Sequence, residues 1–178
     1  MIVLAGASAS GKTEIAKLLA KKYGITKIVT TTTRPMRKGE VNGVDYFFVT
    51  SKRFEEMIRE DKFVEYTLFN GNMYGSTKDQ IARDKCVVID PAGLRSYIAL
   101  KDNSIVTFYL EADEATRYQR MLSRGDEIDK IESRIAHDRE AFKKENIATV
   151  DYIIKNSSDD VLEDVCDHIY QIYTSLKK

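Results

Sequence analysis

The clearest chemical signature in the sequence is the stretch Gly6-Ala7-Ser8-Ala9-Ser10-Gly11-Lys12-Thr13 near the amino end. Its spacing is that of a phosphate-binding loop, G-x-x-x-x-G-K-[ST]. In such a loop the backbone N–H groups turn inward and, with the positive end of the following helix, bind phosphate oxygens. Lys12 is then expected along the outer phosphates of a nucleotide, with the Thr13 hydroxyl as a Mg²⁺ ligand. A chance Gly/Ser-rich turn with a surface lysine is the alternative.

Two arginines in a later loop are a second candidate for phosphate binding. Arg34 and Arg37 are three residues apart, and Pro35 and Gly39 stiffen the loop that carries them. Their guanidinium groups can therefore converge on one phosphate. A solvated basic loop explains this stretch equally well.

Two carboxylates lie within or at the end of apolar runs. Glu65 interrupts the run over residues 63–69, where it is either a solvent-side charge of a half-buried strand or a ligand for a specific partner. Asp90 ends the apolar run over residues 86–89. An acid at the carboxyl end of a strand beside a phosphate loop can hold a magnesium-bound water or position a substrate. Capping of a helix that begins at Pro91 is a serious alternative.

A basic segment follows later in the chain. Arg120 and Arg124 are four residues apart, so they share one face of a predicted helix. Gly125 breaks that helix, and a second helix carries Arg134. Basic residues on a helix usually form no more than a solvated face, which is the alternative to a phosphate-binding role.

Alternating strands and helices are predicted to position these residues. Residues 1–5 are an apolar run typical of a buried strand, and from Lys12 the apolar spacing becomes that of a helix ending near Gly24. Further strands are predicted over residues 25–30, 41–49, 63–69, 86–90, 104–110 and 151–154. Further helices are predicted from Ser51, over residues 76–83, from Asp113, beyond Gly125 and over residues 161–176. This order predicts an α/β fold with a central, mostly parallel sheet and the phosphate loop at its carboxyl edge.

The amino-acid composition limits the classes of protein to which this chain can belong. The 178 residues suit one well-cored domain, and 28 Lys plus Arg balance 28 Asp plus Glu, which does not favour a nucleic-acid or membrane partner. Cys86 and Cys166 fall in apolar segments without metal-ligand spacing, so buried thiols in a reducing compartment are expected. No membrane-spanning run or basic leader is evident, so we expect a cytoplasmic monomer or homodimer. The isolated His137 and His168 are assigned no role.

The segment after the phosphate loop resembles the nucleotide-acceptor domain of guanylate kinases. The resemblance is carried by Thr32, Thr33, Arg34, Arg37, Gly39, Glu40, Gly43, Asp45, Tyr46, residues 63–65, Tyr74, Gly75 and Ser76. The later basic helices resemble the lid of nucleoside monophosphate kinases. Together these resemblances imply a P-loop NTPase core over residues 1–31 and 75–178, an acceptor-binding subdomain over 32–74 and a helical lid over about 120–139.

The same resemblance implies roles for individual residues. ATP is expected on the phosphate loop from Gly6 to Thr13. The phosphate of GMP is expected on Arg34, Arg37, Tyr46 and Tyr74. The guanine base is expected on Glu65, Thr30 and Ser76, with Asp90 nearby as a GMP contact or a holder of a magnesium-bound water. The catalytic charges are expected on Lys12, Arg34, Arg37, Arg120, Arg124 and Arg134.

The implied activity is transfer of the γ-phosphoryl group of ATP to GMP or dGMP, assisted by Mg²⁺. An acceptor phosphate is already nucleophilic, so direct in-line transfer needs positioning and charge neutralisation but no covalent nucleophile. Guanine presents N1–H and 2-amino donors that the carboxylate of Glu65 can accept together, whereas adenine presents a bare N1 acceptor. These donors are the reason to expect a guanine nucleotide as the acceptor.

Five residues depart from the family pattern. Ala7 and Ala9 replace a proline and a glycine of its phosphate loop, Val88 and Ala92 replace an acid and a glutamine of its strand-end motif, and Asp126 replaces a lid threonine. Two other functions therefore stay open: a kinase of another nucleoside monophosphate, and a non-catalytic guanylate-kinase-like module that binds proteins. The intact end of the phosphate loop speaks against the binding module.

Overall fold

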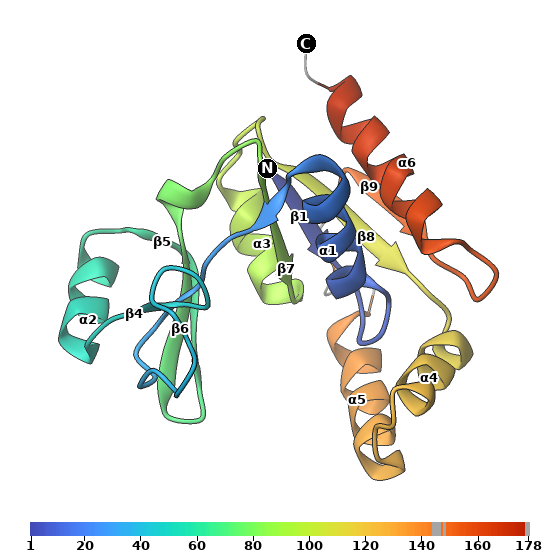
Figure 1. Cartoon of the computed structure of the whole chain (residues 1–178), viewed down its shortest axis with the longest axis horizontal. Helices are drawn as coiled ribbons and strands as arrows, with labels where there is room; N and C mark the ends of the chain where they lie inside the picture. Colours follow the sequence, from blue (N-terminus) through green and yellow to red (C-terminus); the bar gives the residue numbers. More distant parts are fainter. Residues whose placement is uncertain (144–146, 148, 177–178) are drawn as a thin grey trace.

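The computed structural model describes residues 1–143, 147 and 149–176 (Figure 1). The described strands are β1 Ile2–Ala5, β2 Thr26–Lys27, β3 Thr31–Thr32, β4 Phe47–Phe48, β5 Phe63–Phe69, β6 Asn72–Thr77, β7 Lys85–Ile89, β8 Val106–Glu111 and β9 Tyr152–Lys155. The described helices are α1 Lys12–Tyr23, α2 Ser51–Arg59, α3 Pro91–Ala99, α4 Glu114–Ser123, α5 Ile128–Ala141, α6 Leu162–Ser175 and the short 3₁₀ helix Lys78–Gln80. None of these helices is long and apolar enough to cross a membrane.

The core is a parallel sheet in the order β2-β7-β1-β8-β9, which confirms the predicted α/β class. Strand β1 lies at its centre and is buried along its whole length, because layers of helices cover both faces of a parallel sheet. Its alternate side chains enter opposite layers. Ile2 and Leu4 pack with helices α1 and α6, whereas Val3 and Ala5 pack with helix α3.

The register of the central sheet brings two candidate segments to one edge. Ala5 at the end of β1 pairs with Ile89 at the end of β7. The phosphate loop and Asp90 follow these two residues directly, so both leave the carboxyl edge of adjacent strands. In open α/β sheets this edge is where ligands bind.

A second sheet, in the order β4-β3-β6-β5, stands to one side of the core together with helix α2 (Figure 1). Phe54 of α2 is fully buried and stacks on Phe63 of β5, with the ring centroids 4.4 Å apart. Helix α2 therefore covers one face of this sheet with aromatic side chains.

Helices α4 and α5 form a pair on the side of the molecule away from the second sheet (Figure 1). They pack through Met121, Ile131 and Ile135, which are all buried. Gly125 joins them with φ 84°, a conformation that glycine adopts without strain. The predicted break between two helices at this residue is thus confirmed.

Three predicted elements differ in the structure. Of the strand expected over residues 41–49, only Phe47–Phe48 forms a strand, β4, because the residues before it form a turn. The single strand expected over residues 25–30 is replaced by the short strands β2 and β3, because the chain crosses there from the central sheet to the second sheet. The helix expected over residues 76–83 is wrong. Ser76 belongs to β6, where it pairs with Glu65 of β5, and only the 3₁₀ helix Lys78–Gln80 follows it.

Candidate active site

The phosphate loop is held in shape by close contacts with distant parts of the chain. Gly6 has φ 149° and Gly11 has φ 102°. A Cβ at Gly6 would lie 2.6 Å from the backbone oxygen of Leu110, and one at Gly11 would overlap the side-chain amide of Asn156. Both positions therefore require glycine for space as well as conformation. Ala9, with φ 59°, adopts the left-handed region without being glycine.

Lys12 lies folded against this loop. Its Nζ donates hydrogen bonds to the carbonyl oxygens of Gly6, at 2.6 Å, and Ala7, at 2.8 Å. Burial lowers the pKa of Lys12 to about 8, although the carboxylate of Asp138 acts in the opposite direction. A desolvated ammonium group that has only two carbonyl partners gains a stronger partner when a phosphate arrives.

A buried ion pair supports the loop from helix α5. The Asp138 carboxylate accepts a hydrogen bond from the Ser8 backbone N–H at 2.8 Å and another from Arg117 Nη1 at 2.9 Å. The side chains of Arg117 and Asp138 are 8% and 6% exposed. The sequence does contain a signal for this acid, which the prediction missed: Asp138 follows Ile131 and Ile135 on the buried face of α5. A carboxylate on an apolar face is a candidate for a specific buried partner.

A second support, also missed from sequence, comes from the segment after β9. Asn156 is fully buried, and its side-chain amide donates to the Ser10 carbonyl at 2.8 Å. Arg120 of α4 donates to the carbonyl oxygens of Asn156, at 3.1 Å, and Ser157, at 2.9 Å. Arg120 is thereby fixed beside the loop by backbone acceptors that no local pattern reveals.

A pocket of about 430 Å³ opens at the amino end of α1, lined by residues that include Thr13, Arg120 and Arg124. Thr13 is exposed in the first turn of α1, so its hydroxyl is accessible to a ligand. Mg²⁺ keeps several waters and takes few protein ligands beside phosphate oxygens, which suits a single hydroxyl here. Among the described residues, no group of three or more His, Cys, Asp or Glu is placed to hold a metal ion.

The other two basic residues of the helix pair share one carboxylate. Arg134 Nη1 donates to Asp126 Oδ2 at 2.8 Å, and Arg124 Nε donates to Asp126 Oδ1 at 3.1 Å. The Arg124 guanidinium lowers the pKa of Asp126. Both arginine side chains are about half exposed. In this structure these two arginines therefore neutralise an acid of the segment that joins α4 and α5.

The predicted binding residues for the acceptor phosphate gather on the second sheet. Arg34 Nη2 pairs with Glu40 Oε1 at 2.6 Å, and its guanidinium lies 5.3 Å from the ring centroid of Tyr46. Tyr46 in turn contacts Tyr74 edge to face, with centroids 6.0 Å apart. The backbone N–H of Arg37 donates to Glu40 at 2.7 Å, and the residue is exposed. Glu40 thus holds the loop that carries both arginines.

Two of the predicted base-binding residues, Glu65 and Ser76, lie where β5 and β6 pair. Ser76 is buried, and its hydroxyl donates to Glu65 Oε1 at 2.5 Å. Burial raises the pKa of Glu65, and the hydrogen bond from Ser76 opposes that rise. Thr30 lies in the link between β2 and β3, where its carbonyl accepts from the Phe47 N–H at 2.9 Å. Glu65 is therefore a partly buried carboxylate that lacks a cationic partner among the described residues and has oxygen atoms left for donors on a ligand.

Asp90 is the helix cap that the sequence offers as an alternative. Its side chain accepts a hydrogen bond from the Gly93 N–H at 2.8 Å at the start of α3. The residue is nevertheless exposed and lines the same cleft as Glu65. Val88 and Ala92, which depart from the family pattern, also line that cleft.

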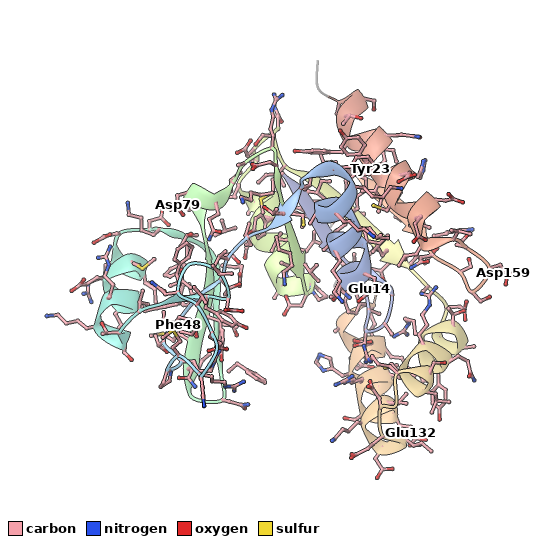
Figure 2. The ribbon with its side chains drawn as sticks, in the orientation of Figure 1. Glu14, Tyr23, Phe48, Asp79, Glu132 and Asp159 are labelled. Atoms are coloured by element: carbon pink, nitrogen blue, oxygen red, sulfur yellow. The ribbon has the colours of Figure 1, made fainter. Side chains whose placement is uncertain are left out.

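One cleft of about 1150 Å³ joins the phosphate loop to Glu65, a predicted base-binding residue. Its walls include Lys12, Glu65, Asp90, Asp138 and His137, a histidine that was assigned no role. In Figure 2, Phe48 marks the second sheet and Glu132 marks helix α5 on opposite sides of the view, and Glu14 marks α1. Arg34 and Arg37 are not among the residues that line this cleft.

Comparisons with known proteins give a consistent result. A family model described as guanylate kinase matches residues 1–175. Two curated guanylate kinases, from two strains of Thermus thermophilus, are each 29% identical over 185 aligned residues. These alignments cover all of this chain and 82% and 81% of the two relatives.

Solved structures agree at the level of the fold. A guanylate kinase from Anaplasma phagocytophilum superposes with a TM-score of 0.59 at 24% identity, covering 98% of this chain and 84% of that one. An uncharacterized protein from Eubacterium ventriosum superposes with a TM-score of 0.57 at 17% identity, covering 98% of both chains.

Proposed function

The chain belongs to the guanylate kinase family, and we propose which of its residues transfer the γ-phosphoryl group of ATP to GMP. The reaction is the ATP-dependent phosphorylation of GMP, which yields ADP and GDP. The relatives do not favour the two other functions left open by the sequence, a kinase of another nucleoside monophosphate and a non-catalytic binding module. We extend the acceptor to dGMP, because every base contact proposed below is independent of the sugar.

The observation that carries the assignment is the continuous cleft between Lys12 and Glu65. A phosphoryl transfer between two nucleotides needs a donor phosphate and an acceptor phosphate in line within one enclosed space. The ammonium group of Lys12 and the carboxylate of Glu65 differ in what they attract. The first suits the donor phosphates, and the second suits the hydrogen-bond donors of a base.

Guanine would bind at the Glu65 end. The edge of guanine carries N1–H and a 2-amino group side by side, and one ionised carboxylate accepts from both. Adenine would offer that partly buried carboxylate no donors from its edge, which a polar pocket rejects strongly. The Thr30 hydroxyl is then directed to guanine O6, while the Ser76 hydroxyl keeps its hydrogen bond to Glu65 beside the base. Asp90 is directed to the rest of the acceptor nucleotide or to a magnesium-bound water.

The phosphate of GMP would bind on the second sheet. Arg34 and Arg37 provide guanidinium groups on one loop, and Tyr46 and Tyr74 provide phenol groups beside them. Glu40 holds that loop through Arg34 and through the Arg37 backbone, so binding does not have to order it. A pre-ordered site lowers the entropic cost of binding. Closure of the second sheet toward the core brings this phosphate to the loop.

ATP would bind on the residues from Gly6 to Thr13, with its phosphates on backbone N–H groups and on Lys12. Thr13 would hold Mg²⁺ beside the nucleotide phosphates, and the ion would supply neutralisation of the charge that develops during transfer. Arg120 already lies beside the loop, whereas Arg124 and Arg134 reach the phosphates when the lid closes. Asp138 keeps the Ser8 N–H and Arg117 in place behind the loop.

Transfer would then be direct and in line. The acceptor phosphate oxygen attacks the γ-phosphorus as the bond to the β-phosphate oxygen breaks, and no residue is covalently modified. Lys12, Arg34, Arg37 and the lid arginines act by holding the phosphates and balancing their charge. Lid closure excludes water, which would otherwise hydrolyse ATP.

The second sheet and the pair of helices α4 and α5, which flank the core, have different proposed roles. Residues 32–74 form the acceptor-binding subdomain, residues about 120–139 form the lid, and residues 1–31 and 75–178 form the core. Both cysteines are buried free thiols, which supports a reducing, cytoplasmic setting. Assembly as a monomer or as a homodimer is compatible with this site, which is built within one chain.

The proposal is tested by an ADP-release assay with ATP, Mg²⁺ and each of GMP, dGMP, AMP, CMP, UMP and dTMP. Turnover is expected with GMP and dGMP alone. Glu65→Gln should raise the KM for GMP by about tenfold or more, because a carboxylate that accepts two hydrogen bonds is lost. The matched control is Glu55→Gln on the exposed face of α2, which should leave every constant unchanged. A Glu65→Gln enzyme with the normal KM for GMP would refute the guanine pocket.

A further inference from the structure

Helix α3 buries one polar atom that the proposed mechanism does not use. Tyr97 is 1% exposed and packs in the cluster that contains Val3 and Leu94. Its hydroxyl is buried and has no hydrogen-bond partner among the described residues. A phenylalanine would fill the same space without leaving a polar atom unpaired, so the hydroxyl imposes a cost on the nucleotide-free protein.

The surroundings of this hydroxyl point to the base-binding residues. Helix α3 packs against β5, and Val64, the neighbour of Glu65, contacts the same cluster as Tyr97. Burial raises the pKa of Tyr97 to about 12, while the neighbouring Ser76 side chain lowers it and the charge of Glu65 raises it. The phenol therefore remains a proton donor at neutral pH, within reach of the Ser76–Glu65 pair.

The hydrogen-bonding capacity of Ser76 completes the argument. A serine hydroxyl has one proton and two acceptor lone pairs. In this structure the proton is given to Glu65 Oε1 at 2.5 Å. The lone pairs are left for a donor, and Tyr97 is a buried donor without an acceptor among the described residues. The free lone pairs of Ser76 and the hydroxyl of Tyr97, which is unpaired in the described part of the chain, are thus neighbours.

We propose that Tyr97 is a positioning residue for guanine recognition, whose hydroxyl donates to Ser76 when GMP is bound and thereby orients Ser76 and Glu65. The inference rests on the proposed role of Glu65 in binding guanine. Hydrogen bonds in such a chain strengthen one another at low local dielectric. The phenol thus acts through Ser76 and does not touch the nucleotide.

The test is Tyr97→Phe, which removes one oxygen and keeps the ring. We expect the KM for GMP to rise about three- to tenfold, the factor of one ordinary hydrogen bond. The KM for ATP and kcat at saturating GMP should stay unchanged. The midpoint of thermal unfolding without nucleotide should stay equal or rise, because an unpaired buried hydroxyl has been removed. In a Ser76→Ala background, Tyr97→Phe should add less than about twofold, since the link to Glu65 is already absent.

Tyr152→Phe is the matched control, because its ring stacks on Phe108 with centroids 5.5 Å apart and it does not line the cleft. It should leave all constants unchanged. The inference is overturned if Tyr97→Phe leaves the KM for GMP unchanged while Glu65→Gln raises it. It is also overturned if Tyr97→Phe lowers the unfolding midpoint and raises both KM values, which is the signature of a structural role. If Glu65→Gln itself has no effect, the guanine pocket fails, and this inference fails with it.

Discussion

Lys12 is expected to destabilise the nucleotide-free protein, and replacing it should reveal by how much. Its ammonium group is mostly withdrawn from water and has two carbonyl oxygens as hydrogen-bond partners. The variant Lys12→Met keeps a long, flexible side chain and removes the charge. It should therefore unfold at higher denaturant concentration than the natural protein while losing phosphoryl transfer.

The magnitude follows from the pKa. Burial lowers the pKa of Lys12 from 10.5 to about 8. Each pKa unit corresponds to about 1.4 kcal/mol, so the charged form costs at most about 3.5 kcal/mol relative to the unfolded chain. Because the folded pKa is the lower one, this cost is fully present below about pH 8. It is lost as the pH rises from about 8 to about 10.5.

The assay compares urea unfolding of the natural protein and Lys12→Met at pH 7 and at pH 10. At pH 7 the variant should be more stable by a margin of up to about 3.5 kcal/mol, and most of that margin should be gone at pH 10. Lys17→Met is the matched control, because Lys17 lies on the same helix with its side chain 67% exposed. That control should show no pH-dependent difference from the natural protein.

ATP binding should restore the proton that Lys12 loses at alkaline pH. At pH 9 a group with a pKa of about 8 is about nine-tenths deprotonated, and bound phosphate restores its charge. Calorimetry in buffers of different ionisation enthalpy should therefore detect uptake of nearly one proton per ATP at pH 9 and almost none at pH 6.5. A stability margin that is equal at pH 7 and pH 10, together with no proton uptake, would refute the reasoning.

Two further predictions concern the supports of the site. Asp138→Ala leaves Arg117 buried without its carboxylate, so the free energy of unfolding should fall by about 3–5 kcal/mol in urea titrations; a loss below about 1 kcal/mol would contradict the role of this pair. Asp126→Asn releases Arg124 and Arg134 for ATP, so the KM for ATP should fall about two- to fivefold at low salt and the difference should fade at high salt. An unchanged or higher KM at low salt would show that Asp126 does not restrain Arg124 and Arg134.

Local patterns in the sequence are sufficient to predict the phosphate loop and the strand and helix that flank it. The helix predicted from Lys12 to about Gly24 is α1, and Gly24 ends it with φ 68°. The apolar run over residues 63–69 is strand β5 over the same residues. These elements were predictable because helix periodicity, strand length and glycine caps depend on near neighbours in the chain.

Elements at the junction between the two sheets were not predictable in the same way. Residues 76–83 have no local feature that forbids a helix, yet Ser76 and Thr77 extend β6. Ser76 and Thr77 pair with β5 across a hairpin, and the residues of β6 just before them pair with β3, more than forty residues earlier. A strand is defined by its partners, and a partner distant in sequence is invisible to a local pattern.

The sequence by itself determined the phosphate loop, the α/β order and the residue types available for nucleotide binding, because glycine spacing, apolar periodicity and functional groups are properties of short segments. Only the tertiary structure decided how those groups are paired and solvated. It joined Asp138 to Ser8, and Asn156 to Ser10, and it buried the Tyr97 hydroxyl near Glu65. Burial and charge pairing are set by residues that are far apart in the chain, and they determine the pKa values and hydrogen bonds on which the chemistry depends.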